Sequence, residues 1–462
     1  MRVLTHPVLR SLVIVAGFYW ILHDWYRPTN LDDPWFGSFI WNSFKHGIED
    51  RDILVGAPAG SGMVGVNHFG KLWSLVYGMA LEMFGWSRGV LHAVSATLTL
   101  IALSLWGKAA HQVGASSRQA QWLVLLLGLS PPFLGMATQA RPEAFAFTLI
   151  SSALVLALAD RWFWAALLGA LAVESHPAAA LGCFWLLPQL LQSWSEPRYS
   201  FRRVLSAGVG GALAVLIYVL LHRPYLGNLV EALRGGSESL GLGRHFAIEY
   251  FFRTKYLRHL PELLIFAGTA VFYFQKPKAF RRLAGPLPAG IVIAGSLLLS
   301  RPNFHYMVYL YPLFVLWFVG VFFAGSDRGI LRPGLILPAL YLALGALIVF
   351  KNHDYSGSRW SDSLAQGAAQ TQGAVVGPPE AWFVLKDRLI LCTDPREPTS
   401  PRVPTWILAT QEGPCSLSSP GGFLSKLLSD RKLVPTSLPD AVFRKGVVFS
   451  WSELEPVRPS GR

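Results

Sequence analysis

Long apolar runs alternate with short polar connections through the first 350 residues of the chain. A helix needs about 20 mainly apolar residues to cross a hydrocarbon core about 30 Å thick. The candidate segments lie at 8–22, 68–85, 88–106, 119–137, 142–159, 162–175, 177–194, 204–222, 259–275, 283–300, 306–324 and 332–350. This pattern predicts an all-α polytopic membrane protein.

Segment 68–85 differs from the other candidates because it contains His68, Lys71 and Glu82. Short loops rich in Lys and Arg stay in the cytoplasm. The basic loops and the N-terminus lie on one side of the membrane only if this segment does not cross. We therefore predict a juxtamembrane helix at the outer interface and about eleven crossings, with the N-terminus in the cytoplasm and the C-terminus outside.

The chain changes character at residue 351, where it becomes polar and rich in Pro and Gly. Short runs of strand or helix character follow at 374–376, 379–386, 389–391 and 447–449. A segment of this length suffices for one small α/β domain. We predict a transmembrane domain at 1–350, with an outer loop at 23–87, and an extracytoplasmic α/β domain at 351–462.

The composition agrees with a membrane protein, since 52% of the residues are hydrophobic and only 15% are charged. The net charge of +13 indicates basic cytoplasmic loops. It does not indicate a nucleic-acid surface, because basic and aromatic residues are not interleaved as in RNA-binding proteins.

Cys183 lies in an apolar helix, whereas Cys392 and Cys415 lie in the polar tail. A disulfide between the latter two requires an oxidising compartment, and the sequence leaves that pairing open.

Unusual polar residues gather on the predicted outer face. They are Asp32, Asp33, His68, Lys71, Arg141, Glu143, His176, Arg301, His305 and Tyr306. An ionisable residue at membrane depth is by default a candidate for function. Their shared sidedness predicts one site on that face.

The adjacent carboxylates Asp32 and Asp33 allow two interpretations. They can begin a helix, since Asp followed by Pro-Trp-Phe is a good helix start. One of them can instead act as a general base on an incoming hydroxyl.

The basic residues also allow two interpretations. His68 and Lys71 suit a lipid phosphate, but Lys also snorkels at interfaces. Arg301 and His305 share a helical face suited to an anionic headgroup. Arg141 and His176 each have a functional interpretation, but taken singly such residues are more often structural parts of a helix corner.

The order of these motifs resembles the GT-C superfamily of membrane glycosyltransferases, which use polyprenyl-phosphate-linked sugars. The likeness is to the protein O-mannosyltransferase and lipid A aminoarabinose transferase group. The matching stretches are Leu31-Asp32-Asp33-Pro34-Trp35-Phe36, Asn67-His68-Phe69-Gly70-Lys71-Leu72-Trp73, Phe84-Gly85 with Arg88, Ala140-Arg141-Pro142-Glu143-Ala144 and Ser175-His176-Pro177. The Pro-Pro pair that opens the juxtamembrane helix in those families is missing here.

The resemblance implies transfer of a sugar from a polyprenyl phosphate to a hydroxyl of a lipid, glycan or protein on the extracytoplasmic face. It implies Asp32 as the general base, with Asp33 beside it, and inversion at the anomeric carbon. The cationic residues would stabilise the leaving phosphate. The expected location is the bacterial inner membrane. No cofactor is implied with certainty, and the need for a divalent cation is left open.

Two other functions remain alternatives. An O-antigen ligase or polymerase would rely on Arg244 and His245 in a large outer loop. A lipid or glycan transporter would place functional charges near the membrane centre, whereas the charges here lie at the outer rim.

Overall fold

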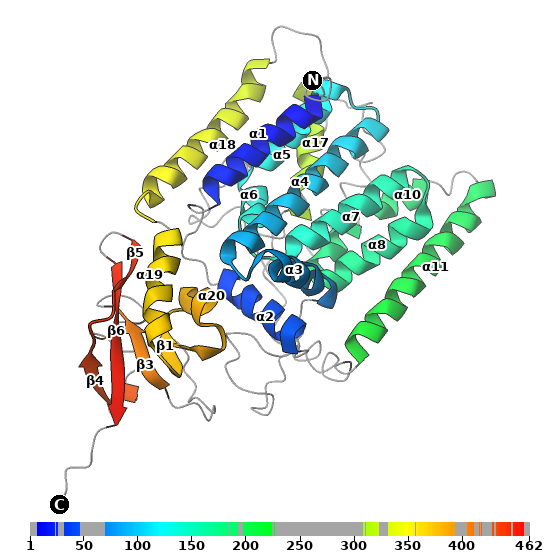
Figure 1. Cartoon of the computed structure of the whole chain (residues 1–462). Helices are drawn as coiled ribbons and strands as arrows, with labels where there is room; N and C mark the ends of the chain where they lie inside the picture. The colour runs from blue at the N-terminus through cyan, green and yellow to red at the C-terminus, as the bar shows by residue number, and fades with distance from the viewer. Residues whose placement is uncertain are drawn as a thin grey trace, which may run out of the picture. The chain divides into compact units, whose positions relative to one another are not determined.

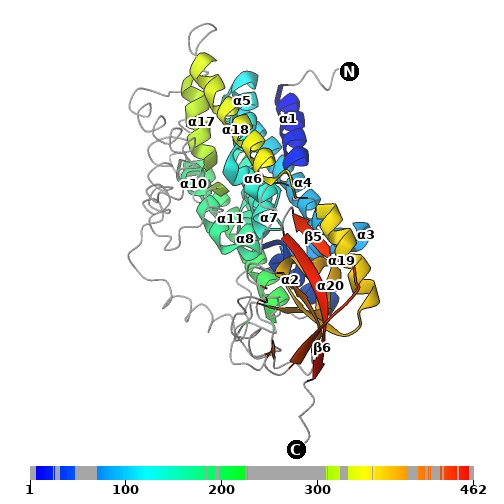
Figure 2. The same cartoon turned by 90° about the vertical axis from the view of Figure 1, so that its left-hand side faces the viewer.

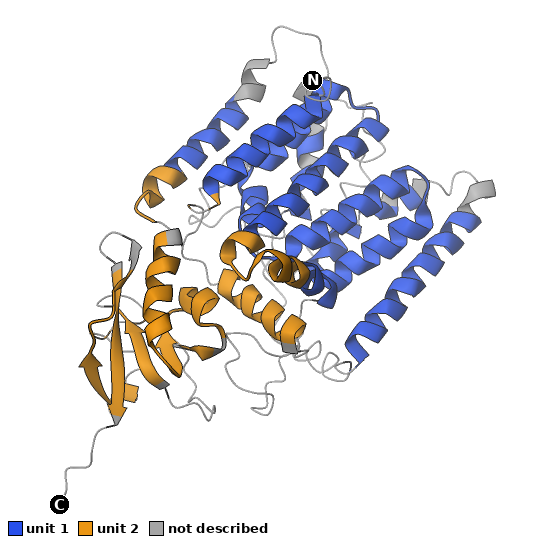
Figure 3. Cartoon of the chain, viewed as in Figure 1, with its two compact units in different colours: residues 1–22, 68–76, 92–347 blue, residues 23–67, 77–91, 348–462 orange. Residues whose placement is uncertain are grey.

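The structure is a computed structural model of the chain (Figures 1 and 2). It describes residues 7–23, 25, 32–46, 70–183, 185–192, 197–223, 226, 308–309, 311–322, 331–355, 357–392, 404–410, 415, 417, 427–428, 431–444 and 447–456. Two compact units make up the chain (Figure 3). Unit 1 comprises residues 1–22, 68–76 and 92–347, and unit 2 comprises residues 23–67, 77–91 and 348–462.

Unit 1 is a bundle of apolar helices. Its elements are α1 (Pro7–Leu22), the start of α3 (Lys71–Phe84), most of α4 (Arg88–Gln112), α5 (Ser117–Leu129), α6 (Pro131–Ala137), α7 (Pro142–Leu158), α8 (Trp162–Ser175), the 3₁₀ turn η2 (Pro177–Ala179), α9 (Ala180–Cys183), α10 (Leu186–Gln192), α11 (Pro197–His222), α17 (Tyr311–Phe322) and most of α18 (Leu331–Asn352). Within the bundle α1 packs on α5, and α8 packs between α7 and α11 (Figure 1). Proline begins α6, α7 and α11, where its fixed φ and missing N–H cost nothing.

The predicted count of eleven crossings is not confirmed. In the described part of the chain two helices, Arg88–Gln112 and Phe201–His222, are long and apolar enough to span a membrane. A third span results if α5 and α6 count as one helix bent by 67°. The helices α1, α7 and α8 are apolar but have only 16, 17 and 14 residues. The predicted segments 259–275 and 283–300 lie outside the described residues.

Segment 177–194 is not the continuous helix that its apolar character predicts. It forms η2, α9 and α10, because Pro177 begins a 3₁₀ turn capped by His176. The corner at residues 174–176 therefore lies between a regular helix and a tight turn. This break holds the corner's polar side chains in place.

Helix α11 leaves a broad apolar face uncovered. Its exposed large side chains include Phe201, Leu205, Val209, Leu216 and Leu220. Contiguous exposed apolar surface of this kind marks an interaction with a membrane or another protein. By length and composition, residues Phe201–His222 of α11 could cross a membrane.

Unit 2 contains α2 (Asp32–His46), the end of α3, the start of α4, the end of α18 and the C-terminal elements. The latter are α19 (Gly357–Gln370), β1 (Ala374–Gly377), η7 (Pro379–Ala381), α20 (Trp382–Leu385), η8 (Lys386–Arg388), β2 (Leu389–Leu391), β3 (Pro404–Ala409), β4 (Arg431–Pro435), β5 (Ala441–Arg444) and β6 (Val447–Pro456). The sheet has the order β2-β1-β3-β6-β4, with β5 pairing β6. Strand β1 is parallel to β2 and β3, and β6 is antiparallel to β3, β4 and β5.

The C-terminal segment has its own hydrophobic core. Trp360 of α19 meets Phe449 of β6 edge to face, with ring centroids 5.3 Å apart. Cys392 and Cys415 form a disulfide, which joins the end of β2 to the segment after β3. The strand-like runs at 374–376, 389–391 and 447–449 are strands, and residues 379–386 form short helical turns. Helix α19 and strands β3, β4 and β5 were not predicted from the sequence.

The prediction of domains at 1–350 and 351–462 stays a prediction. The contacts group residues 23–67 and 77–91, most of which belong to the predicted outer loop, with the C-terminal segment. Helix α2 packs on η7 and α20, and a Cβ at Gly37 would lie 2.7 Å from the Trp382 ring. The helix that carries the acidic pair thus belongs to the same unit as the C-terminal sheet.

Candidate functional site

The predicted site residues fall into three groups. Asp32 and Asp33 begin α2 in unit 2. Four others lie in unit 1: Lys71, Arg141, Glu143 and His176. The last four lie outside the described residues: His68, Arg301, His305 and Tyr306.

In unit 1 the structure brings Arg141, Glu143 and His176 together in a buried cluster. Arg141 precedes the first turn of α7, and Glu143 lies within that turn. The Arg141 guanidinium donates to Glu143 through Nη2 at 2.6 Å and through Nε at 3.0 Å. Arg141 is 5% exposed and Glu143 is 1% exposed. The carboxylate therefore matches the buried positive charge and fixes its direction.

His176 completes this cluster as a neutral ring. Its Nδ1 accepts a hydrogen bond from the Ala178 backbone N–H at 3.1 Å, so the neutral imidazole carries its proton on Nε2. That Nε2 lies 3.6 Å from Glu143 Oε1. Burial lowers the pKa of His176 to about 4, although Glu143 opposes the shift. The ring stacks on Tyr309 with centroids 6.4 Å apart.

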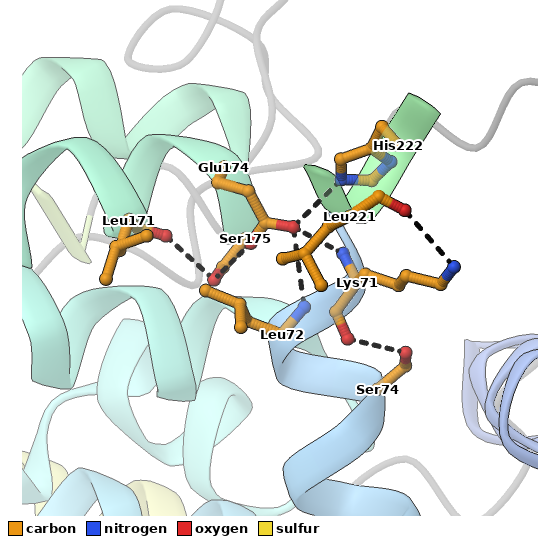
Figure 4. A network of polar contacts seen from close by, with 8 residues as sticks. All are labelled: Lys71, Leu72, Ser74, Leu171, Glu174, Ser175, Leu221 and His222. Carbon is orange, nitrogen blue, oxygen red and sulfur yellow. Dashed lines mark hydrogen bonds and ion pairs between the residues drawn. The ribbon is translucent and has the colours of Figure 1, made fainter. Parts of the chain in front are cut away.

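The same corner holds a second network, centred on Glu174 (Figure 4). Glu174 Oε1 accepts hydrogen bonds from the backbone N–H of Lys71 at 2.6 Å and of Leu72 at 3.4 Å. It also lies 3.0 Å from Nε2 of His222, the last residue of α11. The Ser175 hydroxyl donates to Glu174 Oε2 at 3.1 Å. One carboxylate thus connects the start of α3, the end of α8 and the end of α11.

The Lys71 side chain lies at the edge of this network. Its Nζ donates to the Leu221 carbonyl at 3.3 Å (Figure 4). Burial lowers the pKa of Lys71, and the nearby Glu174 carboxylate acts in the opposite direction. The corner at residues 174–176 consequently contacts two other predicted residues, Lys71 through Glu174 and Glu143 through His176.

Gly70 allows the close approach of Glu174 to the start of α3. A Cβ at position 70 would overlap the backbone oxygen and the carboxylate of Glu174. We expect Gly70→Ala to shift α3 and to destabilise the protein by about 1–3 kcal/mol, the usual cost of overpacking. The measurement is the thermal midpoint of the full-length protein in detergent.

Gly211→Ala is the matched control for this substitution. Gly211 also lies in unit 1, inside helix α11, but a Cβ there would meet no atom within 4 Å. Its midpoint should stay the same or rise slightly, because Ala favours helix more than Gly. Equal midpoints for the two variants would contradict the close packing at Gly70.

In unit 2 the acidic pair divides into one buried and one half-buried carboxylate. Asp33 is 1% exposed, and its Oδ2 accepts a hydrogen bond from Arg88 Nε at 2.7 Å. Arg88 Nη1 also donates to the Tyr355 hydroxyl at 2.9 Å. Asp32 is half-buried in the same first turn, where the helix N-terminus favours negative charge.

The C-terminal segment adds a further acid to this unit. Glu380 lies in η7, and burial raises the pKa of its carboxyl group, whereas Arg88 lowers it. Lys386 Nζ lies 4.7 Å from the centroid of the Trp41 ring of α2. The contact of Lys386 with Trp41 and the packing at Gly37 join α2 to the C-terminal elements.

Three residues of these networks, Glu174, His222 and Tyr355, are not among the predicted site residues. Glu174 is the only charged residue of the apolar stretch 162–175, which was the available signal. His222 and Tyr355 offered no signal, since their partners lie 48 and 267 residues away. Among the residues that the structure describes, no group of three His, Cys, Asp or Glu side chains could hold a metal ion. A divalent cation therefore stays an open expectation.

No family model matches the sequence, and no curated protein matches it. Solved structures do match. ArnT from Cupriavidus metallidurans bound to undecaprenyl phosphate is 12% identical, with a TM-score of 0.63, over 96% of this chain and 97% of that chain. The apo state of that protein is 14% identical with a TM-score of 0.55 over the same shares, 96% and 97%. The apo oligosaccharyltransferase of Archaeoglobus fulgidus is 13% identical with a TM-score of 0.49, over 98% of this chain and 74% of that chain.

At these identities the similarity is one of fold. The chain has the fold of ArnT along nearly its whole length. The resemblance found in the sequence motifs is therefore confirmed at the level of the fold.

Proposed function

We propose that this chain is an integral membrane glycosyltransferase that moves a sugar from a polyprenyl-phosphate donor to an acceptor hydroxyl on the extracytoplasmic face. One observation carries the proposal: the chain shares its fold, over 96% of its length, with a protein crystallised with undecaprenyl phosphate. The acceptor belongs to a lipid, a glycan or a protein.

In the proposed reaction Asp32 is the general base. Its carboxylate takes the proton of the acceptor hydroxyl while that oxygen attacks the anomeric carbon of the sugar. The bond from the anomeric carbon to the phosphate oxygen breaks, the configuration inverts, and polyprenyl phosphate leaves with the electron pair. Asp32 suits this role better than Asp33, because Asp33 is buried against Arg88 whereas Asp32 is half-buried.

The leaving phosphate requires positive charge. Lys71 is the best-defined candidate, because its ammonium is held at the end of α11 by the Leu221 carbonyl. Arg141 is a second candidate whose direction Glu143 fixes. We also assign substrate contacts to His68, His176, Arg301, His305 and Tyr306. Stabilisation of developing charge by such groups is often the largest catalytic contribution.

The proposed location is the bacterial inner membrane, with the N-terminus in the cytoplasm. The disulfide between Cys392 and Cys415 supports an extracytoplasmic C-terminal segment, because disulfides persist in oxidising compartments such as the periplasm. The uncovered apolar face of α11 supports an integral membrane protein.

The proposal is tested first by lipid binding. We expect the purified full-length protein to retain undecaprenyl phosphate more strongly than phosphatidylglycerol when both are offered at equal concentration, measured by native mass spectrometry. Lys71→Met should weaken this retention about tenfold or more, since a hydrogen bond to a charged group contributes about 1.5–3 kcal/mol. Lys45→Met is the control, because Lys45 forms an exposed pair with Glu82.

Turnover provides the second measurement. Proteoliposomes with undecaprenyl-phosphate-linked hexoses or pentoses and an envelope lipid and glycan extract should release undecaprenyl phosphate. If the protein retains undecaprenyl phosphate no better than phosphatidylglycerol, the proposed function is wrong.

A further inference from the structure

We infer that Glu174 is a positioning residue for Lys71, the proposed phosphate ligand. It fixes both the backbone N–H and the side-chain ammonium group of Lys71. This inference rests on the proposed function, because it assigns Glu174 a role in binding the same phosphate. Glu174 itself does not contact the substrate. It acts by fixing where the Lys71 ammonium lies.

Glu174 fixes the backbone N–H of Lys71 directly. Helix α3 begins at Lys71, so its first N–H groups lack partners within the helix. Glu174 Oε1 accepts from the N–H of Lys71 at 2.6 Å and of Leu72 at 3.4 Å. A carboxylate at a helix N-terminus is favoured by both the hydrogen bonds and the helix dipole. Here the carboxylate comes from α8, 103 residues along the chain from Lys71.

Glu174 fixes the ammonium group of Lys71 indirectly, through the end of α11. Lys71 Nζ donates to the carbonyl of Leu221 at 3.3 Å. The next residue, His222, has its Nε2 3.0 Å from the same Oε1 of Glu174. The carboxylate therefore fixes the residue beside the one that holds the ammonium. Figure 4 shows these contacts around Lys71.

The surroundings make this arrangement rigid. Glu174 is only 6% exposed, and the Ser175 hydroxyl donates to its second oxygen at 3.1 Å. Gly70 lets the backbone approach so closely that no other side chain fits there. A lysine side chain is otherwise flexible, and an ammonium that is held in advance binds phosphate with less loss of conformational freedom.

Glu174 contacts the ends of two helices. The residues that Glu174 connects stand where α3 begins and where α11 ends. Lys71 lies within the predicted outer loop 23–87, and His222 directly precedes the predicted outer loop 223–258. The carboxylate thus anchors the Lys71 ammonium relative to the helix ends and not relative to the loops.

The inference is tested by a double-mutant cycle on undecaprenyl phosphate affinity. Glu174→Gln keeps the side-chain shape and one carbonyl oxygen but removes the charge that His222 and the α3 N-terminus face. We expect the Kd of the full-length protein for undecaprenyl phosphate to rise about tenfold, or 1.4 kcal/mol. In a Lys71→Met background the same substitution should change the Kd by less than twofold, because the positioned group is then gone.

Three further variants serve as controls. Glu82→Gln alters an exposed carboxylate of the same helix α3, paired with Lys45, and should leave the Kd within twofold. His222→Leu removes the contact to Glu174 and should raise the Kd, whereas His222→Gln keeps an N–H donor and should restore most of the affinity. The His222 pair also tests the inference if Glu174→Gln does not fold.

The outcomes separate the inference from the proposed function. If the wild-type protein binds undecaprenyl phosphate and Glu174→Gln raises the Kd equally in both backgrounds, Glu174 has only a structural role and the inference is wrong. It is also wrong if Lys71→Met leaves the affinity unchanged. If the wild-type protein does not bind undecaprenyl phosphate, the proposed function itself fails.

Discussion

Asp32→Asn is expected to lower the rate of sugar transfer by about 10²–10⁴-fold, the usual contribution of a general base. Asn has the same shape as Asp but cannot accept the proton of the acceptor hydroxyl. The measurement is the release of undecaprenyl phosphate in proteoliposomes. Binding of undecaprenyl phosphate should change little, since the proposed role of Asp32 concerns the acceptor.

The stability of the Asp32→Asn variant separates chemistry from folding. Asp32 is half-buried in the first turn of α2, and Asn suits a helix start as well as Asp does. The thermal midpoint should therefore stay within the range of surface substitutions, about 0.5 kcal/mol. Transfer at the wild-type rate by Asp32→Asn would exclude Asp32 as the base.

Arg88→Met is expected to have the largest effect on stability, a loss of about 3–5 kcal/mol, because it leaves a buried carboxylate without its cation. Asp33 is 1% exposed and lies 2.7 Å from Arg88 Nε. The substitution also removes the donor to the Tyr355 hydroxyl. The measurement is chemical or thermal unfolding of the full chain in detergent, with limited proteolysis to locate the loosened segment in unit 2.

Two variants control this result. Lys45→Met breaks the pair of Lys45 and Glu82, whose side chains are 33% and 48% exposed, and should cost only about 0–1 kcal/mol. The double variant Asp33→Asn with Arg88→Met should recover much of the loss, because no unpaired charge then stays buried. If Arg88→Met costs no more than Lys45→Met, Asp33 does not depend on Arg88 in the folded protein.

The two aspartates illustrate the limit of local sequence reasoning. A helix that begins at the acidic pair follows from the residues themselves, and α2 does begin at Asp32. Asp33 is the buried acid because it pairs with Arg88, which lies 55 residues away in the chain. Arg88 in turn donates to Tyr355, 267 residues further along. The packing of α2 on the C-terminal elements makes that choice.

The corner at residues 174–176 shows the same division. The sequence indicated a functional corner from His176 and its neighbours. The partners of Glu174 became known only when α3 and α11 were placed against α8, because no local pattern links residues 71, 174 and 222.

The sequence alone determined the class of protein, the positions of most helices of unit 1, the helix at 71–84 and three strands of the C-terminal sheet, β1, β2 and β6. These features depend on the spacing of apolar residues and on proline at helix starts, which act over a few residues. Only the tertiary structure decided the pairing of Cys392 with Cys415, the burial of Asp33 and the contacts of Glu174. Each of these joins residues distant in the chain, and such pairs form where packed elements bring complementary side chains within bonding distance.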